Sequence, residues 1–208
     1  MKTIVVKLVC FLMPLLSFAQ DADAFLDDVY NKVTSYENIH IDFKYALRNV
    51  EQGVSQETRG DVTLQGQKFV LNLLGVTQLY DGNKLHVIIP EDEEINISKF
   101  NEEGMSPSEL LTFYKKGFKA EMDIVQNISG RKIQYVKLTP TTKTAEYSHI
   151  LLGVDQESKH IYRQIIIQND GTEITITVNK FKPNQPLSDT LFTFDMAKYS
   201  DYYINELD

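Results

Sequence analysis

The stretch IHIDFKYALR, residues 39–48, alternates apolar and polar side chains almost without a break. One set points to one side of an extended chain: Ile39, Ile41, Phe43, Tyr45 and Leu47. The other set points to the opposite side: His40, Asp42, Lys44 and Arg48. Alternation with a period of two is typical of a β-strand with one dry face and one solvated face. The stretch therefore predicts a strand whose apolar face is covered by another part of the molecule.

Similar alternating runs follow this strand almost to the end of the chain. They cover roughly residues 57–65, 67–74, 76–81, 84–90 and 93–100, and after a gap 118–128, 131–139, 147–155, 160–168, 172–182 and 190–195. Turn signals such as Asp81-Gly82, Ser129-Gly130 and Asp170-Gly171 lie between them. Strands joined by short turns pair as antiparallel neighbours. The sequence therefore predicts one large antiparallel sheet of about 11 strands.

Two segments replace this alternation with helical spacing. Residues 21–37 carry apolar side chains along one stripe, with two aspartates at the favourable N-terminal end. In residues 105–118, MSPSELLTFYKKGF, Ser106 and Glu109 form a capping box and Gly117 provides a stop. Because an open sheet must cover its apolar concave face, we expect both helices to lie over that face. The predicted fold is mainly β, an open antiparallel half-barrel with a helical lid, and a fully closed lipocalin-like barrel is the alternative.

The beginning of the chain has the features of an export signal. Lys2 and Lys7 frame the start of an apolar run at residues 8–16, and Ser17-Phe18-Ala19 follows as a small-residue cleavage site. The run is far shorter than the roughly 20 apolar residues that span a bilayer. We therefore expect a cleavable signal peptide at residues 1–19.

Export has consequences for the remaining residues, 20–208, which we expect to form a single domain in the periplasm. The only cysteine of the chain, Cys10, lies in the predicted signal, so thiol chemistry and disulfides are not expected. After removal of the signal, 19 basic residues face 29 acidic residues, a net charge of −10. Nucleic-acid backbones are bound by clustered lysine and arginine, which this chain lacks, so nucleic acid is not an expected partner.

The sequence shows no catalytic or metal-binding pattern. None of the four histidines, His40, His86, His149 and His160, has the helical spacing of a zinc site. The acidic cluster at residues 91–94 lacks the spaced oxygen ligands and the glycine of a calcium loop. A nucleophile elbow and a phosphate-binding glycine loop are also missing from the sequence. We therefore expect a binding protein without catalytic residues, metal or cofactor, and not an enzyme.

Several longer segments occur in an order and spacing that together carry a resemblance. They are NKVTSYENIHIDF (31–43), GDVTLQGQKFVL (60–71), LYDGNKLHV (79–87), SPSELLTFYKKGF (106–118), KLTP (137–140) and VNKFKPNQPLSDTLFTFD (178–195). Over nearly all of residues 20–208 the chain resembles the outer-membrane lipoprotein carrier family, LolA. The resemblance implies an open half-barrel with a helical lid and a hydrophobic cavity.

The same resemblance implies a function and partners. Such a protein is a monomeric periplasmic chaperone that binds the acyl chains of lipoproteins. It receives acylated lipoproteins from an ABC-type exporter of the inner membrane and delivers them to a lipoprotein receptor of the outer membrane. Two alternatives share the fold: a periplasmic carrier of another acylated molecule, such as a glycolipid or a lipid-linked precursor, and a lipoprotein-sensing regulator.

The predicted acyl-chain site has a lid and a floor. The resemblance places five side chains on the lid, namely Leu26, Tyr30, Val33, Leu110 and Leu111. Alternation alone selects six side chains for the floor, namely Phe43, Tyr45, Phe69, Leu71, Leu85 and Val87. We expect Leu111→Glu and Phe69→Glu to lower cargo binding and to leave a folded protein.

One position departs from the family pattern. Where well-studied members carry an arginine that helps to hold the lid closed, this chain has Gly66, with Lys68 nearby. An ammonium group does not reproduce the planar fork of a guanidinium. We therefore expect lid closure in this chain to depend mainly on apolar packing.

Overall fold

The computed structural model describes residues 21–99, 107 and 109–207. Its helices are α1 (Ala22–Thr34) and three short 3-10 helices, η1 (Glu109–Leu111), η2 (Phe113–Lys115) and η3 (Met196–Tyr199). Its strands are β1 (Ile39–Asn49), β2 (Val54–Gln65), β3 (Lys68–Leu73), β4 (Val76–Tyr80), β5 (Lys84–Ile89), β6 (Glu94–Lys99), β7 (Phe118–Ile128), β8 (Arg131–Pro140), β9 (Tyr147–Asp155), β10 (Ile161–Gln168), β11 (Glu173–Pro183) and β12 (Tyr203–Leu207). The predicted signal peptide lies outside the described residues.

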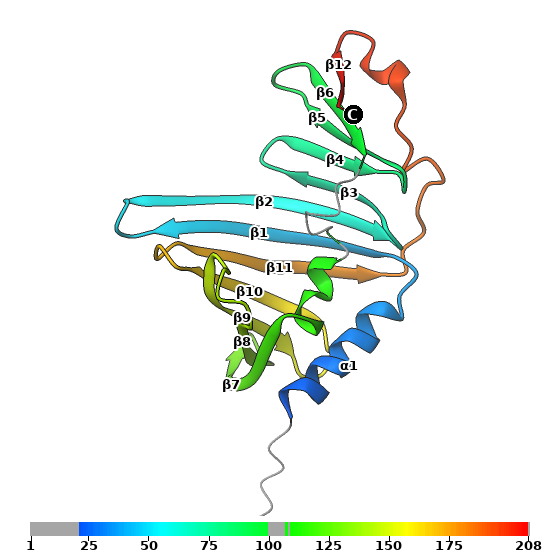
Figure 1. Ribbon diagram of the computed structural model, residues 1–208. Helices are drawn as coiled ribbons and strands as arrows, with labels where there is room; N and C mark the ends of the chain where they lie inside the picture. Colours follow the sequence, from blue (N-terminus) through cyan, green and yellow to red (C-terminus); the bar gives the residue numbers. More distant parts are fainter. Residues whose placement is uncertain (1–20, 100–106, 108, 208) are drawn as a thin grey trace, which may run out of the picture.

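The twelve described strands form one open sheet in the order β12-β6-β5-β4-β3-β2-β1-β11-β10-β9-β8-β7 (Figure 1). Neighbours pair antiparallel, except that β12 runs parallel to β6. Strand β1, which contains the alternating stretch at residues 39–48, lies near the middle between β2 and β11. The outermost strands, β12 and β7, do not pair with each other, so the sheet is a half-barrel and the closed barrel is excluded. The predicted mainly β fold is confirmed.

The last strand differs from the sequence prediction. Alternation predicts a strand at residues 190–195, but these residues form turns and an irregular segment. The chain continues through η3, and Tyr203 to Leu207 pair with Glu94 to Ser98 on β6. β12 pairs with a strand about 100 residues earlier in the chain. Such pairing depends on the tertiary path of the chain, and local alternation contains no information about that path. The added strand covers an edge that β6 would otherwise leave open.

The second predicted helix is also less regular than expected. The residues after 108 form two 3-10 turns separated by Thr112, whose φ of −134° is not helical. A segment this short gains little from helical hydrogen bonding, so tertiary packing decides its shape. The cap expected at Ser106 lies outside the described residues.

Helix α1 begins where the sequence indicates and packs on the concave face. The Asp21 carboxylate accepts a hydrogen bond from the Asp23 backbone N–H at 3.1 Å, which caps the helix. Phe25, Leu26, Val29 and Val33 are buried on one side of the helix, as the apolar stripe predicts.

The described residues form two apolar clusters, one on each face of the sheet. The larger cluster lies on the concave side between α1, the short helices and strands from both halves of the sheet. The smaller cluster lies on the convex side, where Ile88, Ile95 and Ile97 pack against Phe194 and Tyr199. These two residues belong to residues 187–207, which follow the β11 strand and are termed the C-terminal segment. Helices α1, η1 and η2 therefore cover the concave face (Figure 1), whereas η3 contributes Tyr199 to the convex cluster.

Candidate functional site

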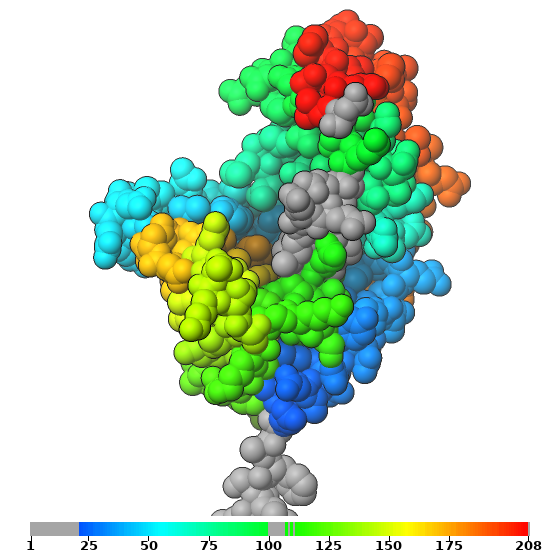
Figure 2. Space-filling view, viewed as in Figure 1, coloured from blue at the N-terminus to red at the C-terminus, as the bar shows by residue number. Residues whose placement is uncertain are grey.

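Residues 109–117, together with Pro107, are termed the lid segment. Their two 3-10 turns lie on the concave side of the sheet next to α1 (Figure 1). Figure 2 shows this light green segment seated between the blue helix and the yellow-green strands. Leu111, Phe113 and Tyr114 pack against the concave core. The lid segment therefore lies over the apolar face of the sheet.

An apolar cavity of about 170 Å³ lies between the lid segment and the sheet. The described residues that line it are Ile41, Phe43, Tyr45, Val62, Leu64, Leu71, Leu73, Pro107, Leu111, Ile161, Gln164, Ile176 and Val178. Twelve of these thirteen side chains are apolar or aromatic. Its walls come from β1, β2, β3, β10, β11 and the lid segment, so distant parts of the sequence meet around one space.

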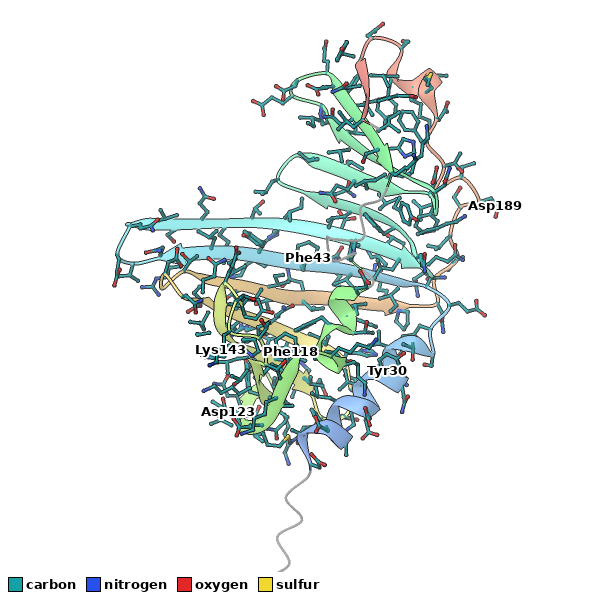
Figure 3. The ribbon with its side chains drawn as sticks, viewed as in Figure 1. Tyr30, Phe43, Phe118, Asp123, Lys143 and Asp189 are labelled. Carbon is teal, nitrogen blue, oxygen red and sulfur yellow. The ribbon has the colours of Figure 1, made fainter. Side chains whose placement is uncertain are left out.

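Strand register explains why Phe43 reaches into this space. On β1, Phe43 pairs with Val178 of β11 on one side and with Gly60 of β2 on the other. A Cβ atom at Gly60 would lie 2.7 Å from the Phe43 ring and 2.6 Å from the carbonyl oxygen of Asn72. The absence of a side chain at Gly60 thus makes room for the ring, which Figure 3 labels near the centre of the sheet.

The cavity is small for a ligand site in this state. Pockets that hold small molecules usually measure roughly 300–1,000 Å³, which exceeds the volume enclosed here. An acyl chain with many methylene groups therefore requires the space to widen. The lid segment is the wall with the fewest sheet hydrogen bonds, so it is the wall that can move most easily.

The structure brings four of the predicted site residues together around the cavity: Phe43, Tyr45, Leu71 and Leu111. The other described residues of the predicted site lie outside its lining. Leu26, Val33 and Phe69 are fully buried in the concave core, Leu85 packs partly buried against that core, Val87 is partly buried, and Tyr30 is 37% exposed on α1. The side chain of Leu110 lies outside the described part of the chain. Contact of these residues with an acyl chain stays a prediction.

Sequence reasoning selected four of the thirteen described lining residues, and none of those four comes from the late strands. Ile161, Gln164, Ile176 and Val178 lie on β10 and β11. Ile176 and Val178 belong to an alternating run, so a signal for them was present in the sequence. It could not be used, because which late strand lies beside β1 follows from the sheet order alone.

An ion pair joins the lid segment to α1. The Lys115 ammonium group pairs with the Asp27 carboxylate and lies 5.4 Å from the centre of the Tyr30 ring. Gly66 and Lys68 are exposed at the turn between β2 and β3. This chain therefore links its lid segment to α1 through Lys115, which lies far along the sequence from the position of the family arginine.

Tyr114 is the buried anchor of the lid segment. Its side chain is 4% exposed, and its hydroxyl has no hydrogen-bond partner among the described residues. Burial raises the pKa of Tyr114 far above its ordinary value, and the nearby Tyr30 and Asp27 raise it further. The hydroxyl therefore stays neutral, and the ring holds the lid segment by packing.

The described residues contain no group of three or more histidine, cysteine or acidic side chains that could hold a metal ion. A second hollow, on the polar side of β1, is lined by residues that include Asp42, Arg59, Asp61 and Lys180. There the Asp42 carboxylate pairs with the Lys180 ammonium group at 3.2 Å and with His40 Nε2 at 3.1 Å. Because Asp42 and Lys180 already pair with each other, the apolar cavity is the stronger candidate for a binding site.

The fold and the cavity together define a class of protein, the open β half-barrels that enclose an apolar space beneath short helices. The family model described as outer membrane lipoprotein carrier protein LolA matches residues 34–195, which is more than half of the chain. The chain therefore belongs to the LolA family. No relative was found among the curated proteins. Among the described residues, none of the helices combines the length and the apolar character that crossing a membrane requires.

Solved structures of three proteins share this fold. An uncharacterized conserved protein from Thermus thermophilus has a TM-score of 0.60 at 8% identity, over 87% of this chain and 98% of that one. Lipoprotein LppX from Mycobacterium tuberculosis has a TM-score of 0.51 at 18% identity, over 80% and 97% of the two chains. LprF from Mycobacterium bovis has a TM-score of 0.52 at 14% identity, over 80% and 94%. At these identities the likeness shows the fold alone.

Proposed function

We propose that the protein is a periplasmic chaperone that binds the acyl chains of lipoproteins released from the inner membrane and carries them to the outer membrane. The observation that carries this proposal is the apolar cavity between the lid segment and the sheet. Membership of the LolA family supports the same role. The predicted signal at residues 1–19 supports export to the periplasm.

The physical need for such a carrier follows from the hydrophobic effect. Exposing an acyl chain of some fifteen methylene groups to water costs on the order of 10 kcal/mol, at about 0.8 kcal/mol per group. Free diffusion of acylated cargo through water is therefore negligible. A cavity lined by apolar side chains removes this cost for as long as the chain is enclosed.

The same energetics require partners for loading and release. Cargo held by burial of that size leaves slowly, so release must occur to a site that binds equally well or better. We propose an ABC-type exporter of the inner membrane as the source that drives loading and a lipoprotein receptor of the outer membrane as the acceptor.

The test is capture of a triacylated lipoprotein from inner-membrane vesicles that contain the exporter and ATP. We expect the wild-type protein to emerge as a soluble complex with the lipoprotein, identified by native mass spectrometry. Leu111→Glu places a charge in the cavity lining and should abolish capture. Leu74→Glu is the matched control, because Leu74 is exposed outside the lining.

Two results would change the proposal. Equal capture by the wild type and Leu111→Glu would show that the cavity is not the site. Capture of a glycolipid or a lipid-linked precursor in place of lipoprotein would keep the cavity as the site but replace the cargo.

A further inference from the structure

Among the described residues, two glutamine side chains are almost fully buried, and one of the two makes hydrogen bonds through its amide. Gln134 is 4% exposed, and its Nε2 donates hydrogen bonds to the carbonyl oxygens of Asp123 and Tyr135, each at 2.8 Å. Its Oε1 accepts a hydrogen bond from Gln156 Nε2 at 3.3 Å. Gln164 is 8% exposed, yet its side chain makes no hydrogen bond to any residue that the structure describes. Gln164 therefore differs from an ordinary buried amide.

The sheet register directs Gln164 into the cavity. On β10 it pairs with Leu152 of β9 and with Ile176 of β11. Ile176 lines the cavity, and Leu152 is fully buried in the concave core. Side chains of directly paired residues lie on the same face of a sheet, so Gln164 lies on the concave face among apolar neighbours. It belongs to the cavity lining itself.

The Gln164 amide keeps its remaining accessible surface at the cavity. Among the described residues, the Tyr114 hydroxyl is the only side-chain polar group that is both fully buried and unpartnered, so the amide atoms of Gln164 are not sealed inside the core. An amide that faces an apolar space without a hydrogen bond gives up part of its hydration, and a leucine or methionine would fit the same surroundings without that loss. A buried water needs two to four polar partners, whereas Tyr45 supplies the one other polar side chain of the described lining. A residue that breaks the local apolar pattern without compensation within the fold indicates a role in binding.

We propose that Gln164 is the polar subsite of the cavity and binds the ester carbonyl that joins an acyl chain to glycerol. This inference rests on the proposed function, because it requires an acyl chain in the cavity. The Gln164 Nε2 group donates a hydrogen bond to the carbonyl oxygen and so fixes how far the chain enters. The ligand class is an acyl ester, since the carboxylate of a free fatty acid would bring an unpaired charge into an apolar space.

Matched lipids that differ only in the linkage test this assignment. The first pair is 1-palmitoyl lysophosphatidylcholine and its 1-hexadecyl ether analogue, which lacks the carbonyl. The second pair is an S-diacylglyceryl lipopeptide and its dialkyl ether analogue. Displacement of a fluorescent fatty-acyl probe gives the dissociation constant of each lipid. We expect the wild-type protein to prefer the ester by about fivefold to tenfold, where tenfold equals about 1.4 kcal/mol.

Two variants separate the subsite from general packing. Gln164→Met keeps the approximate volume and removes the amide, so it should lose the ester preference and keep its affinity for the ether. Gln78→Met is the matched control, because Gln78 pairs with the cavity residue Leu71 but lies outside the cavity lining. It should keep the wild-type preference. Thermal unfolding checks that Gln164→Met is folded, and we expect it to be at least as stable as the wild type.

The outcomes separate this inference from the proposed function. Tight binding of esters and ethers without preference, or an unchanged preference in Gln164→Met, would overturn the role of Gln164 and leave the carrier function intact. Failure of the wild type to bind any of the four lipids would overturn both. A preference with the lipopeptide pair alone supports the subsite with the lipoprotein anchor as its source, and a preference with both pairs supports it for acyl glycerol esters in general.

Discussion

At the scale of single residues, alternation alone cannot separate core from cavity. Phe69 and Leu71 share the concave face of β3, but Phe69 is 1% exposed in the core, whereas Leu71 lines the cavity. The Phe69 ring also packs against Tyr80, with ring centres 5.8 Å apart. Substitutions at positions that look equivalent in the sequence should therefore have different effects.

Phe69→Glu should destabilise the whole protein. Loss of the buried ring alone costs about 3–5 kcal/mol, and the described residues of the concave core, all apolar or aromatic, offer the new carboxylate no counter-charge. This revises the sequence-based expectation that the variant stays folded. Urea unfolding followed by circular dichroism gives the change in the free energy of unfolding.

Leu111→Glu provides the comparison. Leu111 is partly exposed on the lid segment, so the carboxylate can turn towards water. We expect a change in the free energy of unfolding below about 1 kcal/mol. Equal destabilisation by the two variants would show that Leu111 is core and not lid.

At the scale of elements, we expect the contact between α1 and the lid segment to govern access to the cavity. It combines the buried Tyr114 ring with the Lys115 and Asp27 ion pair. Both partners of the pair are at least one-third exposed, so solvent weakens the attraction. We therefore expect the pair to change how often the lid segment opens and to contribute little to global stability.

Asp27→Asn should loosen the lid segment. We expect amide hydrogens of Thr112, Lys115 and Lys116, which close the 3-10 turns, to exchange about two- to fivefold faster, with global stability changed by less than about 1 kcal/mol. Hydrogen exchange measured by NMR tests this. Asp28→Asn is the control, because Asp28 lies on the same helix but near Lys159, at 3.9 Å. Equal exchange in both variants would contradict a role for the Lys115 pair.

The C-terminal end of α1 is held in place by a contact between Tyr36 and His160. Tyr36, just after the helix, has its hydroxyl 2.8 Å from His160 Nε2, and the His160 ring stacks on Phe181 at 3.9 Å. Burial, and then the charge of Lys32, lower the pKa of His160 below its ordinary value. The folded protein therefore favours the neutral ring.

This predicts a loss of stability on the acid side. Because the pKa of His160 is lower in the folded state, the unfolded chain binds the proton first as the pH falls below about 6.5. The contribution of neutral His160 to the free energy of unfolding is therefore complete above that pH. It decreases as the pH falls below that value and is lost once the pH has passed through the folded-state pKa. His160→Gln should therefore lose less stability than the wild type between pH 7 and pH 5, measured by urea unfolding.

A second variant makes the pH experiment specific. Tyr36→Phe removes the hydrogen bond and keeps the titrating ring. We therefore expect this variant to be less stable than the wild type by a similar amount at pH 7 and at pH 5. His149, whose pKa is also lowered by burial and Lys137, keeps part of the pH dependence in every variant. An identical pH dependence in the wild type and His160→Gln would refute the role of His160.

At the scale of the whole molecule, the two faces of the sheet have different structural roles. The concave face encloses the cavity, and the C-terminal segment covers the convex cluster of Ile88, Ile95 and Ile97. His86 is buried on that face and stacks on Phe194, with ring centres 4.4 Å apart. The described cavity lining contains no residue of the C-terminal segment, so stability and binding are separable.

Removal of residues 187–208 should lower stability without removing the binding site. The exposed isoleucines and the open edge of β6 should lower the thermal midpoint and promote association. Affinity for an acyl lipid per folded molecule should stay within about twofold, because every described lining residue remains. Removal of residues 203–208 alone is the milder control, since it keeps Phe194. Loss of lipid binding by the folded truncated protein would show that the C-terminal segment takes part in the site.

The sequence by itself determined strands β1 to β11, the dry face of each of these strands, and helix α1. These features follow from local rules: the period of two in β1 and the apolar stripe and cap of α1 depend on neighbouring residues alone. The antiparallel order of the hairpins also followed, because short turns force adjacent strands to pair. Phe43, Tyr45 and Leu71 lie at the cavity for this reason, since alternation selects the correct face, whereas the family resemblance selected Leu111.

Only the tertiary structure decided which part of that face is filled and which part is hollow. The cavity exists where Phe43 and Tyr45 of β1 meet Val178 and Ile176 of β11, more than 130 residues later in the chain. Its volume depends on how side chains from distant strands pack, and no local pattern contains that information. The same holds for the unpaired amide of Gln164, the link between Lys115 and Asp27, and the return of β12 to β6. Each is a contact between segments that the sequence separates and the sheet order brings together.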